Sequence, residues 1–349
     1  MSEVSNPYER KGPAQFWRTG VAAVEASEIL PLRPRRFLLD ADDSIATAGS
    51  CFAQNLAKRL HSRQSTKFLR TEFIAEDQPL FSALYGNIYT VRQLVQLFDE
   101  AFEQREPALL ALRRPDGRYV DALRPNVFAA GFADQVHVLR ARLEHLAAVR
   151  RVFTECTVFV FTLGLTESWR ARIDGTVYPL APPVVSDEAE IDDFEFHNFT
   201  YQEITEDLRG FVERISKVNP GVRILLTVSP VPLTATYTDE HVLVASSHSK
   251  AILRAACAEL EAANEAICYF PAYEIITGPF SRGAYYEANL RSVAQVGVDH
   301  VMRAFDANFL ASASDDGGQR RPGQPPRLEL ESNDRVICDE EELTKSIGF

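Results

Sequence analysis

The stretch ATAGSCFAQNLAKRL, residues 46–60, passes from small and β-branched residues into a helical pattern, and this change decides the fold. Its first part continues an apolar run, and Gly49 then permits a sharp turn that other residues rarely adopt. From Phe52 onward an apolar side chain recurs at every fourth residue, which gives one apolar helix face. The stretch therefore predicts a strand followed at once by a helix, with the hydroxyl of Ser50 and the thiol of Cys51 at the junction.

The rest of the chain repeats this alternation of apolar runs and amphipathic segments. Continuous Val, Leu, Ile and Phe is typical of strands that are buried on both faces of a parallel sheet. Strands are expected over 45–48, 156–164, 223–231 and 267–276, and helices over 51–61, 90–104, 133–150, 201–217, 246–265 and 294–311. Alternating strands and helices predict a doubly wound α/β sheet with right-handed crossovers.

Two internal regions and the tail depart from this pattern. Residues 105–132 and 170–200 carry Pro, Gly and Asp with little periodicity, so we expect insertions or loops over one end of the sheet. Residues 312–349 combine Gly, Pro, Ser and charged residues and end in an acidic segment, which predicts a linker and an acidic C-terminal tail. The sequence therefore predicts a single α/β domain over residues 1–311.

Composition narrows the class of protein. The chain has 349 residues, of which 46% are hydrophobic and 25% are charged, as in ordinary globular proteins. Its net charge of -12 argues against nucleic-acid binding, which needs Lys and Arg on phosphates. We find neither a long apolar run nor the apolar core of a secretory signal, so we expect a cytoplasmic protein without a membrane partner, either a monomer or a homodimer. Five cysteines without paired spacing predict no metal site and no disulfide framework.

Ser50 has more than one interpretation from the residues alone. A serine at a helix start commonly caps the helix by accepting a hydrogen bond from a backbone N–H. The carboxyl end of a parallel strand is also where ligands bind, and helix N-terminal N–H groups can stabilise an oxyanion, so Ser50 is a candidate nucleophile. Cys51 is the competing nucleophile, because a helix N-terminus lowers the pKa of a thiol. We favour Ser50, since position 51 begins the apolar face and turns toward the core.

Several stretches resemble one family when they are read in order. They are GSCFA at 49–53, YGNIYT at 85–90, TLGLTESW at 162–169, NPGVRILLTVSPVPL at 219–233 and SHSKAILRA at 247–255. Together they resemble the GSCFA family, a branch related to the SGNH/GDSL hydrolases, from about residue 30 to residue 310. The resemblance implies a three-layer α/β/α, flavodoxin-like fold with a mostly parallel central sheet, in which Ser50 takes the place of the nucleophile.

The resemblance also implies an oxyanion hole built from two further blocks. Gly86, with Asn87 beside it, corresponds to the first block. The second block departs from the related enzymes, which have Gly-x-Asn where this chain has Gly-Leu-Thr-Glu over 164–167. The hydroxyl of Thr166 can donate a hydrogen bond, so we expect Thr166 and Glu167 to take part in a differently built site. A turn glycine remains the alternative for Gly86.

The general base is the weakest part of the resemblance. SGNH enzymes supply a histidine from an Asp-x-x-His motif before the last helix, but here Asn289 to Ser292 reads Asn-Leu-Arg-Ser. The nearest imidazole downstream is that of His300, which we take as the candidate base, with a structural histidine as the alternative. His248, at an expected helix start, is the reserve. The remaining histidines, among them His145, are expected to be structural or solvated.

Three classes of function follow from the resemblance. The first is a serine esterase or deacetylase acting on an acylated small molecule or carbohydrate, which needs no cofactor. The second is an O-acyltransferase in polysaccharide biosynthesis, for which acetyl-CoA is a conceivable donor. The third is a catalytically inactive binding protein on the same fold, because the Asp-x-x-His motif is missing. No Gly-rich nucleotide loop indicates another cofactor.

Overall fold

The computed structural model describes residues 6–34, 36–62, 67–73 and 81–310. Its centre is a five-stranded sheet in the order β10-β9-β5-β1-β2. The strands are β1 (Ser44–Gly49), β2 (Lys67–Phe68), β5 (Val158–Leu163), β9 (Arg223–Val228) and β10 (Ile267–Tyr269). Every pair of neighbours in this sheet is parallel, which confirms the predicted parallel sheet.

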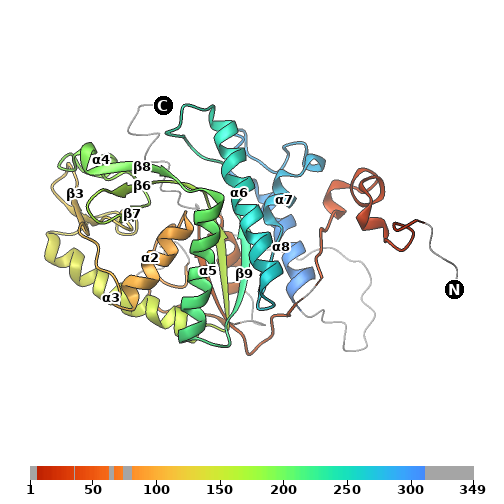
Figure 1. Ribbon diagram of the computed structural model, residues 1–349, viewed down its shortest axis with the longest axis horizontal. Helices are drawn as coiled ribbons and strands as arrows, with labels where there is room; N and C mark the ends of the chain where they lie inside the picture. The colour runs from red at the N-terminus through yellow and green to blue at the C-terminus, as the bar shows by residue number, and fades with distance from the viewer. Residues whose placement is uncertain (1–5, 35, 63–66, 74–80, 311–349) are drawn as a thin grey trace.

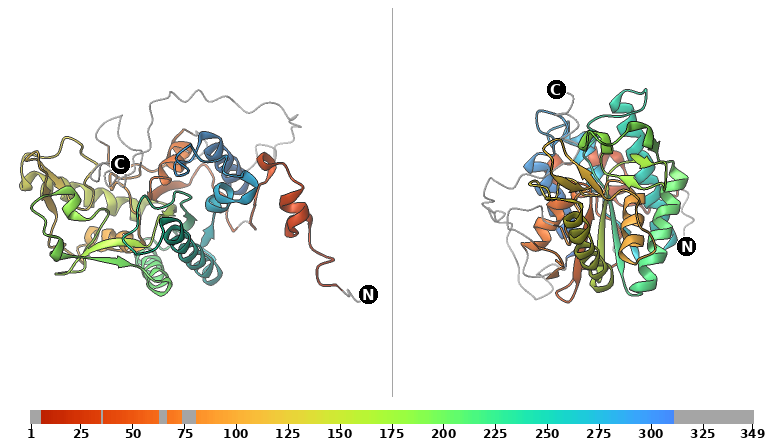
Figure 2. Two further views of the ribbon diagram at one scale, coloured as in Figure 1. Left: turned by 90° about the horizontal axis from the view of Figure 1, so that it is seen from above. Right: turned by 90° about the vertical axis from the view of Figure 1, so that its left-hand side faces the viewer.

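Helices cover both faces of this sheet (Figures 1 and 2). One face carries α2 (Val91–Ala101), α3 (Gln135–Glu155), α5 (Tyr201–Val218) and α6 (Val242–Ala263). The opposite face carries α1 (Ala53–His61), α7 (Ala272–Thr277) and α8 (Gln295–Phe309). The predicted three-layer α/β/α architecture is therefore confirmed.

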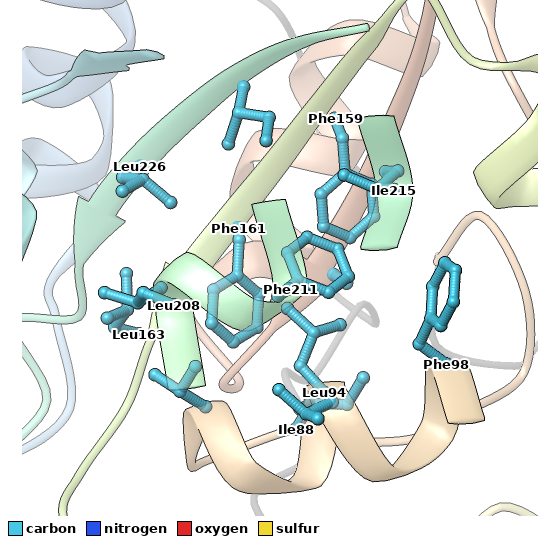
Figure 3. Close-up of a cluster of buried hydrophobic side chains, with 14 of the residues drawn as sticks. Ile88, Leu94, Phe98, Phe159, Phe161, Leu163, Leu208, Phe211, Ile215 and Leu226 are labelled. Atoms are coloured by element: carbon cyan, nitrogen blue, oxygen red, sulfur yellow. The ribbon is translucent and has the colours of Figure 1, made fainter. Parts of the chain in front are cut away.

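Alternate residues of β5 explain why this strand is apolar at all positions but Thr162. Phe159 and Phe161 point into the cluster under α2, α3, α5 and α6, where the rings of Phe159 and Phe211 lie 5.4 Å apart (Figure 3). Val158 and Val160 belong to the cluster under α1, α7 and α8. Because successive side chains of a strand point to opposite faces, a strand between two helix layers has no solvent face.

Two helix starts show how the sequence sets boundaries next to the sheet. Thr90 caps α2 and Thr200 caps α5, and each forms a capping box with the Gln or Glu three residues later. Two boundaries differ from expectation. Helix α6 begins at Val242, four residues before the expected start, and the strand expected over 267–276 ends at Tyr269. The strand does not continue through Pro271, because proline cannot donate a ladder hydrogen bond. Pro271 is instead the N-cap of α7.

The insertions are more ordered than the sequence predicts. The first contains a hairpin of β3 (Ala111–Arg113) and β4 (Tyr119–Asp121). The second forms the antiparallel sheet β7-β6-β8 and a short helix; the elements are β6 (Glu167–Ala171), β7 (Val177–Tyr178), β8 (Phe194–Asn198) and α4 (Pro182–Val185). Of the two expected forms, insertions or loops, these regions take the first, and together they build a small apolar cluster. The predicted linker and tail, 312–349, lie outside the described residues.

The N-terminal segment extends away from the body of the molecule (Figures 1 and 2). It contains short helical turns over Pro13–Gln15, Arg18–Ala22 and Ala26–Glu28. Its inner end returns to α8, where Arg303 donates to the carbonyl of Ser27. This contact joins the start of the described chain to its last helix.

Candidate functional site

Three loops converge at the carboxyl end of β1. The N–H of Ser50 donates to the carbonyl of Thr162 over 3.0 Å, which continues the β1–β5 pairing past the strand end. The N–H of Ile88 donates to the carbonyl of Gly49 over 2.9 Å, so the loop over 85–90 lies beside the same turn. The GSCFA, YGNIYT and TLGLTESW stretches are therefore neighbours in space, as the parallel arrangement predicts.

The glycines of these loops permit the close approach. Gly49 has φ +134°, and a Cβ added there would lie 2.3 Å from the carbonyl oxygen of Thr162. A Cβ on Gly164 would lie 2.9 Å from the carbonyl oxygen of Tyr89 and 3.2 Å from the Cβ of Ser50. Gly86 has φ +69°, a conformation that favours glycine. The turn interpretation of Gly86 is thus compatible with the backbone, whereas Gly164 serves close packing against Ser50.

The hydroxyl of Ser50 is buried and makes no hydrogen bond within the described residues. Ser50 exposes only 2% of its surface. It does not cap the following helix, because α1 begins at Ala53 with Phe52 as its cap, and the N–H of Ala53 donates to the backbone carbonyl of Ser50. A buried hydroxyl without a partner costs about 1–3 kcal/mol, so a capping role does not account for this serine.

The cysteines of the described part of the chain are all buried, and none of them forms a disulfide there: Cys51, Cys156, Cys257 and Cys268. Burial raises the pKa of Cys156 to about 12 and the pKa of Cys268 to about 11, so these two are core thiols without thiolate character at neutral pH. Cys51 lies beside Ser50 and remains the competing nucleophile.

Thr166 and Glu167 hold the second loop in place. Thr166 donates its hydroxyl proton to Asn198 on β8 over 2.7 Å, and its N–H donates to the hydroxyl of Ser249 on α6. The carboxylate of Glu167 accepts hydrogen bonds from the hydroxyl of Thr236 over 2.7 Å and from the N–H of Tyr237 over 3.3 Å. Both side chains therefore anchor the loop to β8 and to the segment after β9.

Polar side chains on one face of α6 support this loop and the segment after β9. Lys250 is buried and donates from its Nζ to the carbonyl of Gly164, next to the Thr166 contact of Ser249. Ser246 accepts a hydrogen bond from the N–H of Leu233 over 3.1 Å. The spacing i, i+3, i+4 within SSHSK puts these three polar groups on one helix face, and that pattern is the signal that could have found them.

His300 lies away from Ser50. It is buried on α8, where the hydroxyl of Tyr285 lies 2.6 Å from its Nδ1 and the carbonyl oxygen of Ile29 lies 2.8 Å from its Nε2. A carbonyl only accepts, so Nε2 carries the proton and Nδ1 accepts the hydroxyl of Tyr285. Burial lowers the pKa of His300. Both ring nitrogens are occupied, which matches the structural alternative and leaves none for Ser50.

His248 does not contact Ser50 either. It lies in the second turn of α6, because this helix begins earlier than the sequence predicts, and its side chain is exposed. The neighbouring Ser249 and Lys250 occupy the face that contacts the site loop. The place of the missing Asp-x-x-His is a turn in which Asn289 donates its amide to the hydroxyl of Ser292. The structure therefore assembles the expected loops around Ser50 without either expected base.

The described ranges contain neither a helix that could span a membrane nor a cluster of metal-ligating side chains. No helix there is long and apolar enough to cross a bilayer. No three His, Cys, Asp or Glu side chains in those ranges gather as the ligands of a metal ion would.

The fold and the site define a three-layer α/β/α protein with a serine turn after the first strand of a parallel sheet, packed against loops from the next two blocks. The model of the GSCFA family matches residues 44–305, and the chain therefore belongs to the GSCFA family. This confirms the family resemblance of the sequence.

The chain was also compared with curated proteins and with solved structures. No curated protein matches the chain. Among solved structures, the chain is similar to a protein from Parabacteroides merdae described as a GDSL-like lipase, with 15% identity and a TM-score of 0.33. That match covers 78% of this chain and 98% of the other.

Proposed function

We propose that the protein is a serine esterase or deacetylase that acts on an acylated small molecule or carbohydrate, with Ser50 as its nucleophile. The observation that carries the proposal is the Ser50 hydroxyl, which is buried without a partner where three loops meet. In the reaction, the Ser50 oxygen bonds to the acyl carbon, the ester bond between the acyl carbon and the alcohol oxygen breaks, and the alcohol leaves with the proton that Ser50 gives up. Water then releases the acyl group and restores the serine.

We assign oxyanion stabilisation to the loop of Gly86 and Asn87. This loop is held against the residue before Ser50 by the hydrogen bond between Ile88 and Gly49. The N–H of Ser50 is engaged by Thr162, and the hydroxyl of Thr166 is engaged by Asn198. The donors of the first block are therefore the better candidates for the negative oxygen that develops in the transition state.

The positions of His300 and His248 affect the rate of ester hydrolysis that we expect. A general base contributes about 10²–10⁴-fold to such reactions, and neither expected imidazole reaches Ser50. We therefore expect hydrolysis of simple esters to be slower by about this factor than in a serine hydrolase with a complete triad.

Hydrolysis of p-nitrophenyl acetate by the purified protein tests the proposal. We expect Ser50→Ala to reduce release of p-nitrophenol to the background, while Cys51→Ala keeps most of the activity. Ser50→Ala should also unfold at the same temperature as the parent or slightly higher, because it removes an unpartnered buried hydroxyl. An active Ser50→Ala together with an inactive, folded Cys51→Ala would assign the nucleophile to the thiol.

A binding protein is the second candidate, because both nitrogens of His300 are bonded elsewhere. Activity that is equal in the parent and in Ser50→Ala on a panel of short acyl esters would favour it. The same panel with an added sugar acceptor and acetyl-CoA separates hydrolysis from O-acyl transfer, since only transfer leaves an acetylated sugar. Loss of the acetyl product in Ser50→Ala would assign the transfer to the same site.

A further inference from the structure

A small, partly open cavity lies between α2 and α3, next to the candidate site. The cavity has a volume of about 30 Å³, which is enough for about two waters or one small functional group. Its wall includes Asn87, Ile88, Gln96, Glu100, Arg142 and His145. The first two residues belong to the loop that contacts Gly49, so the cavity and the candidate site share a wall.

His145 presents a free acceptor to this cavity. Its Nδ1 lies 2.6 Å from a carboxylate oxygen of Glu72, which also accepts the N–H of Leu84. Burial alone would raise the pKa of Glu72, but the hydrogen bond to His145 and the nearby Arg124 lower it to about 2, and burial lowers the pKa of His145 to about 4. The pair at neutral pH is thus a carboxylate and a neutral imidazole whose Nδ1–H donates to Glu72. The Nε2 then carries a lone pair, and it is buried without a partner in the described part of the chain.

Glu100 presents a second free acceptor. Its Oε2 receives two hydrogen bonds from Arg142, of 2.6 and 3.1 Å. Its Oε1 is buried and has no partner among the described residues, although the residue exposes only 4% of its surface. Burial raises the pKa of Glu100 even though Arg142 opposes the rise. This carboxylate therefore lacks a full complement of positive charge and donors.

The charges around the cavity do not balance. Arg142 donates to both Glu100 and Asp121, and Arg124 donates to Asp121. Three carboxylates, on Glu72, Glu100 and Asp121, face two guanidiniums, on Arg124 and Arg142. Arg105 also attracts Glu100, but it donates to the carbonyl of Asp174 and to the hydroxyl of Thr176. With His145 neutral and Glu100 ionised, the directly paired groups therefore carry one excess negative charge, and a cation at Oε1 of Glu100 would favour that ionised form.

We propose that this cavity binds the primary ammonium group of a small-molecule ligand. An ammonium group supplies one positive charge and three N–H donors, which meet the excess charge and the two free acceptors on Glu100 and His145. A hydroxyl or a water brings no charge. The ligand class is therefore small amines, and the group would lie beside the loop of Asn87 and Ile88.

Calorimetric titration of the intact protein with methylammonium chloride tests the proposal, with tetramethylammonium chloride at equal ionic strength as the control. We expect saturable binding of one methylammonium per chain, with a rise of about 2 °C in unfolding temperature at ten times the Kd. Tetramethylammonium has no N–H donor and should not bind. Equal responses to the two salts, or no saturable response to methylammonium, would overturn the proposal and leave the cavity to ordered water.

Two matched variants, one on α2 and one two residues past its last residue, place the site. Glu100→Gln keeps the shape of the side chain and removes its charge, and we expect it to weaken methylammonium binding by about tenfold or more. Glu103→Gln is the control, because the Glu103 side chain is 84% exposed, and it should change the affinity by less than about twofold. Unchanged affinity in folded Glu100→Gln would contradict the proposal. If Glu100→Gln does not fold, His145→Gln replaces it with the same expectation.

The proposal of an ammonium site and the proposal of an esterase can be contradicted independently of each other. Ser50→Ala should bind methylammonium as the parent does, because Ser50 does not line the cavity. Binding without esterase activity would support the ammonium site and count against the nucleophile. Esterase activity without binding would do the reverse.

Discussion

Two buried histidines on opposite faces of the sheet have opposite environments. His300 on α8 has a partner for each ring nitrogen, Tyr285 and Ile29. His145 on α3 has one partner, Glu72, and its other nitrogen is buried beside a cavity. The first histidine holds the N-terminal segment to the fold, whereas the second is a carboxylate-oriented imidazole with a free acceptor. Position along the chain therefore does not tell which histidine is available for chemistry.

The partners of the two histidines explain this. Ile29 is 271 residues from His300, and Glu72 is 73 residues from His145. The sequence shows each histidine within an amphipathic helix, and it shows nothing of what the fold places opposite. Where a motif such as Asp-x-x-His is absent, only the structure separates a satisfied imidazole from an unsatisfied one.

The largest effect is expected from breaking the ionic cluster around His145. Arg142→Met removes the partner of Glu100 and Asp121 and leaves two buried carboxylates short of positive charge. We expect the free energy of unfolding to fall by about 3–5 kcal/mol, measured by urea denaturation. Arg140→Met on the same helix is the control, because its side chain is 80% exposed, and it should cost less than about 0.5 kcal/mol. Equal losses in the two variants would show that the cluster does not stabilise the fold.

Acid should destabilise the His145 face. The pKa of His145 is about 4 in the folded protein and near 6.5 when unfolded, so the unfolded chain binds the proton more readily between these values. Stability is therefore complete above pH 6.5 and falls as the pH drops toward 4, by an amount on the order of 3 kcal/mol. The pKa of Glu72 is lowered to about 2, so protonation of this carboxylate lowers the free energy of unfolding further as the pH falls below 4.5. Urea midpoints from pH 7 to pH 4 measure this loss, and a flat profile would contradict it; His145→Gln should flatten the upper part.

His300→Phe should affect stability without affecting turnover. It removes two hydrogen bonds and leaves the carbonyl of Ile29 unpaired, for an expected loss of about 1–3 kcal/mol in unfolding free energy. Ester hydrolysis at a temperature where the variant is folded should stay within about twofold of the parent, a spread smaller than any general-base effect. A loss of two or more orders of magnitude in the folded variant would restore His300 as the base.

The smallest effect is expected from His248→Ala. The side chain is exposed on α6 and its neighbours make the contacts to the site loop, so unfolding free energy should change by less than about 0.5 kcal/mol. Ester hydrolysis should be unchanged as well. A clear loss of activity would mean that α6 presents this imidazole to substrate.

Much of the fold can be predicted from the sequence, because β5 and β9 are mostly apolar and alternate with amphipathic helices. The GSCFA and TLGLTESW stretches meet because the carboxyl ends of parallel strands β1 and β5 share one edge, and YGNIYT joins them as the family resemblance implies. Strand β2 is only two residues long and β6–β8 lie in an insertion with little periodicity, so neither gives a signal. The apolar run after residue 267 hides the break at Pro271 between β10 and α7.

The site itself was predicted only in its local parts. The Gly49 and Ser50 turn follows from neighbouring residues. The support of the second loop by Lys250, and the pairing of Glu72 with His145, depend on contacts between distant segments. Such contacts arise from packing of whole helices on the sheet, which no local pattern encodes.

Labelling with a serine-directed fluorophosphonate tests the central claim, that Ser50 is a nucleophile, most directly. In this reaction the serine oxygen bonds to phosphorus, fluoride leaves, and the hydroxyl proton passes to buffer. Intact-mass measurement followed by peptide mapping should show one adduct per chain on the peptide that contains Ser50, with none in Ser50→Ala. No adduct after prolonged incubation of the folded protein, or an adduct on Cys51 or another residue, would contradict the account.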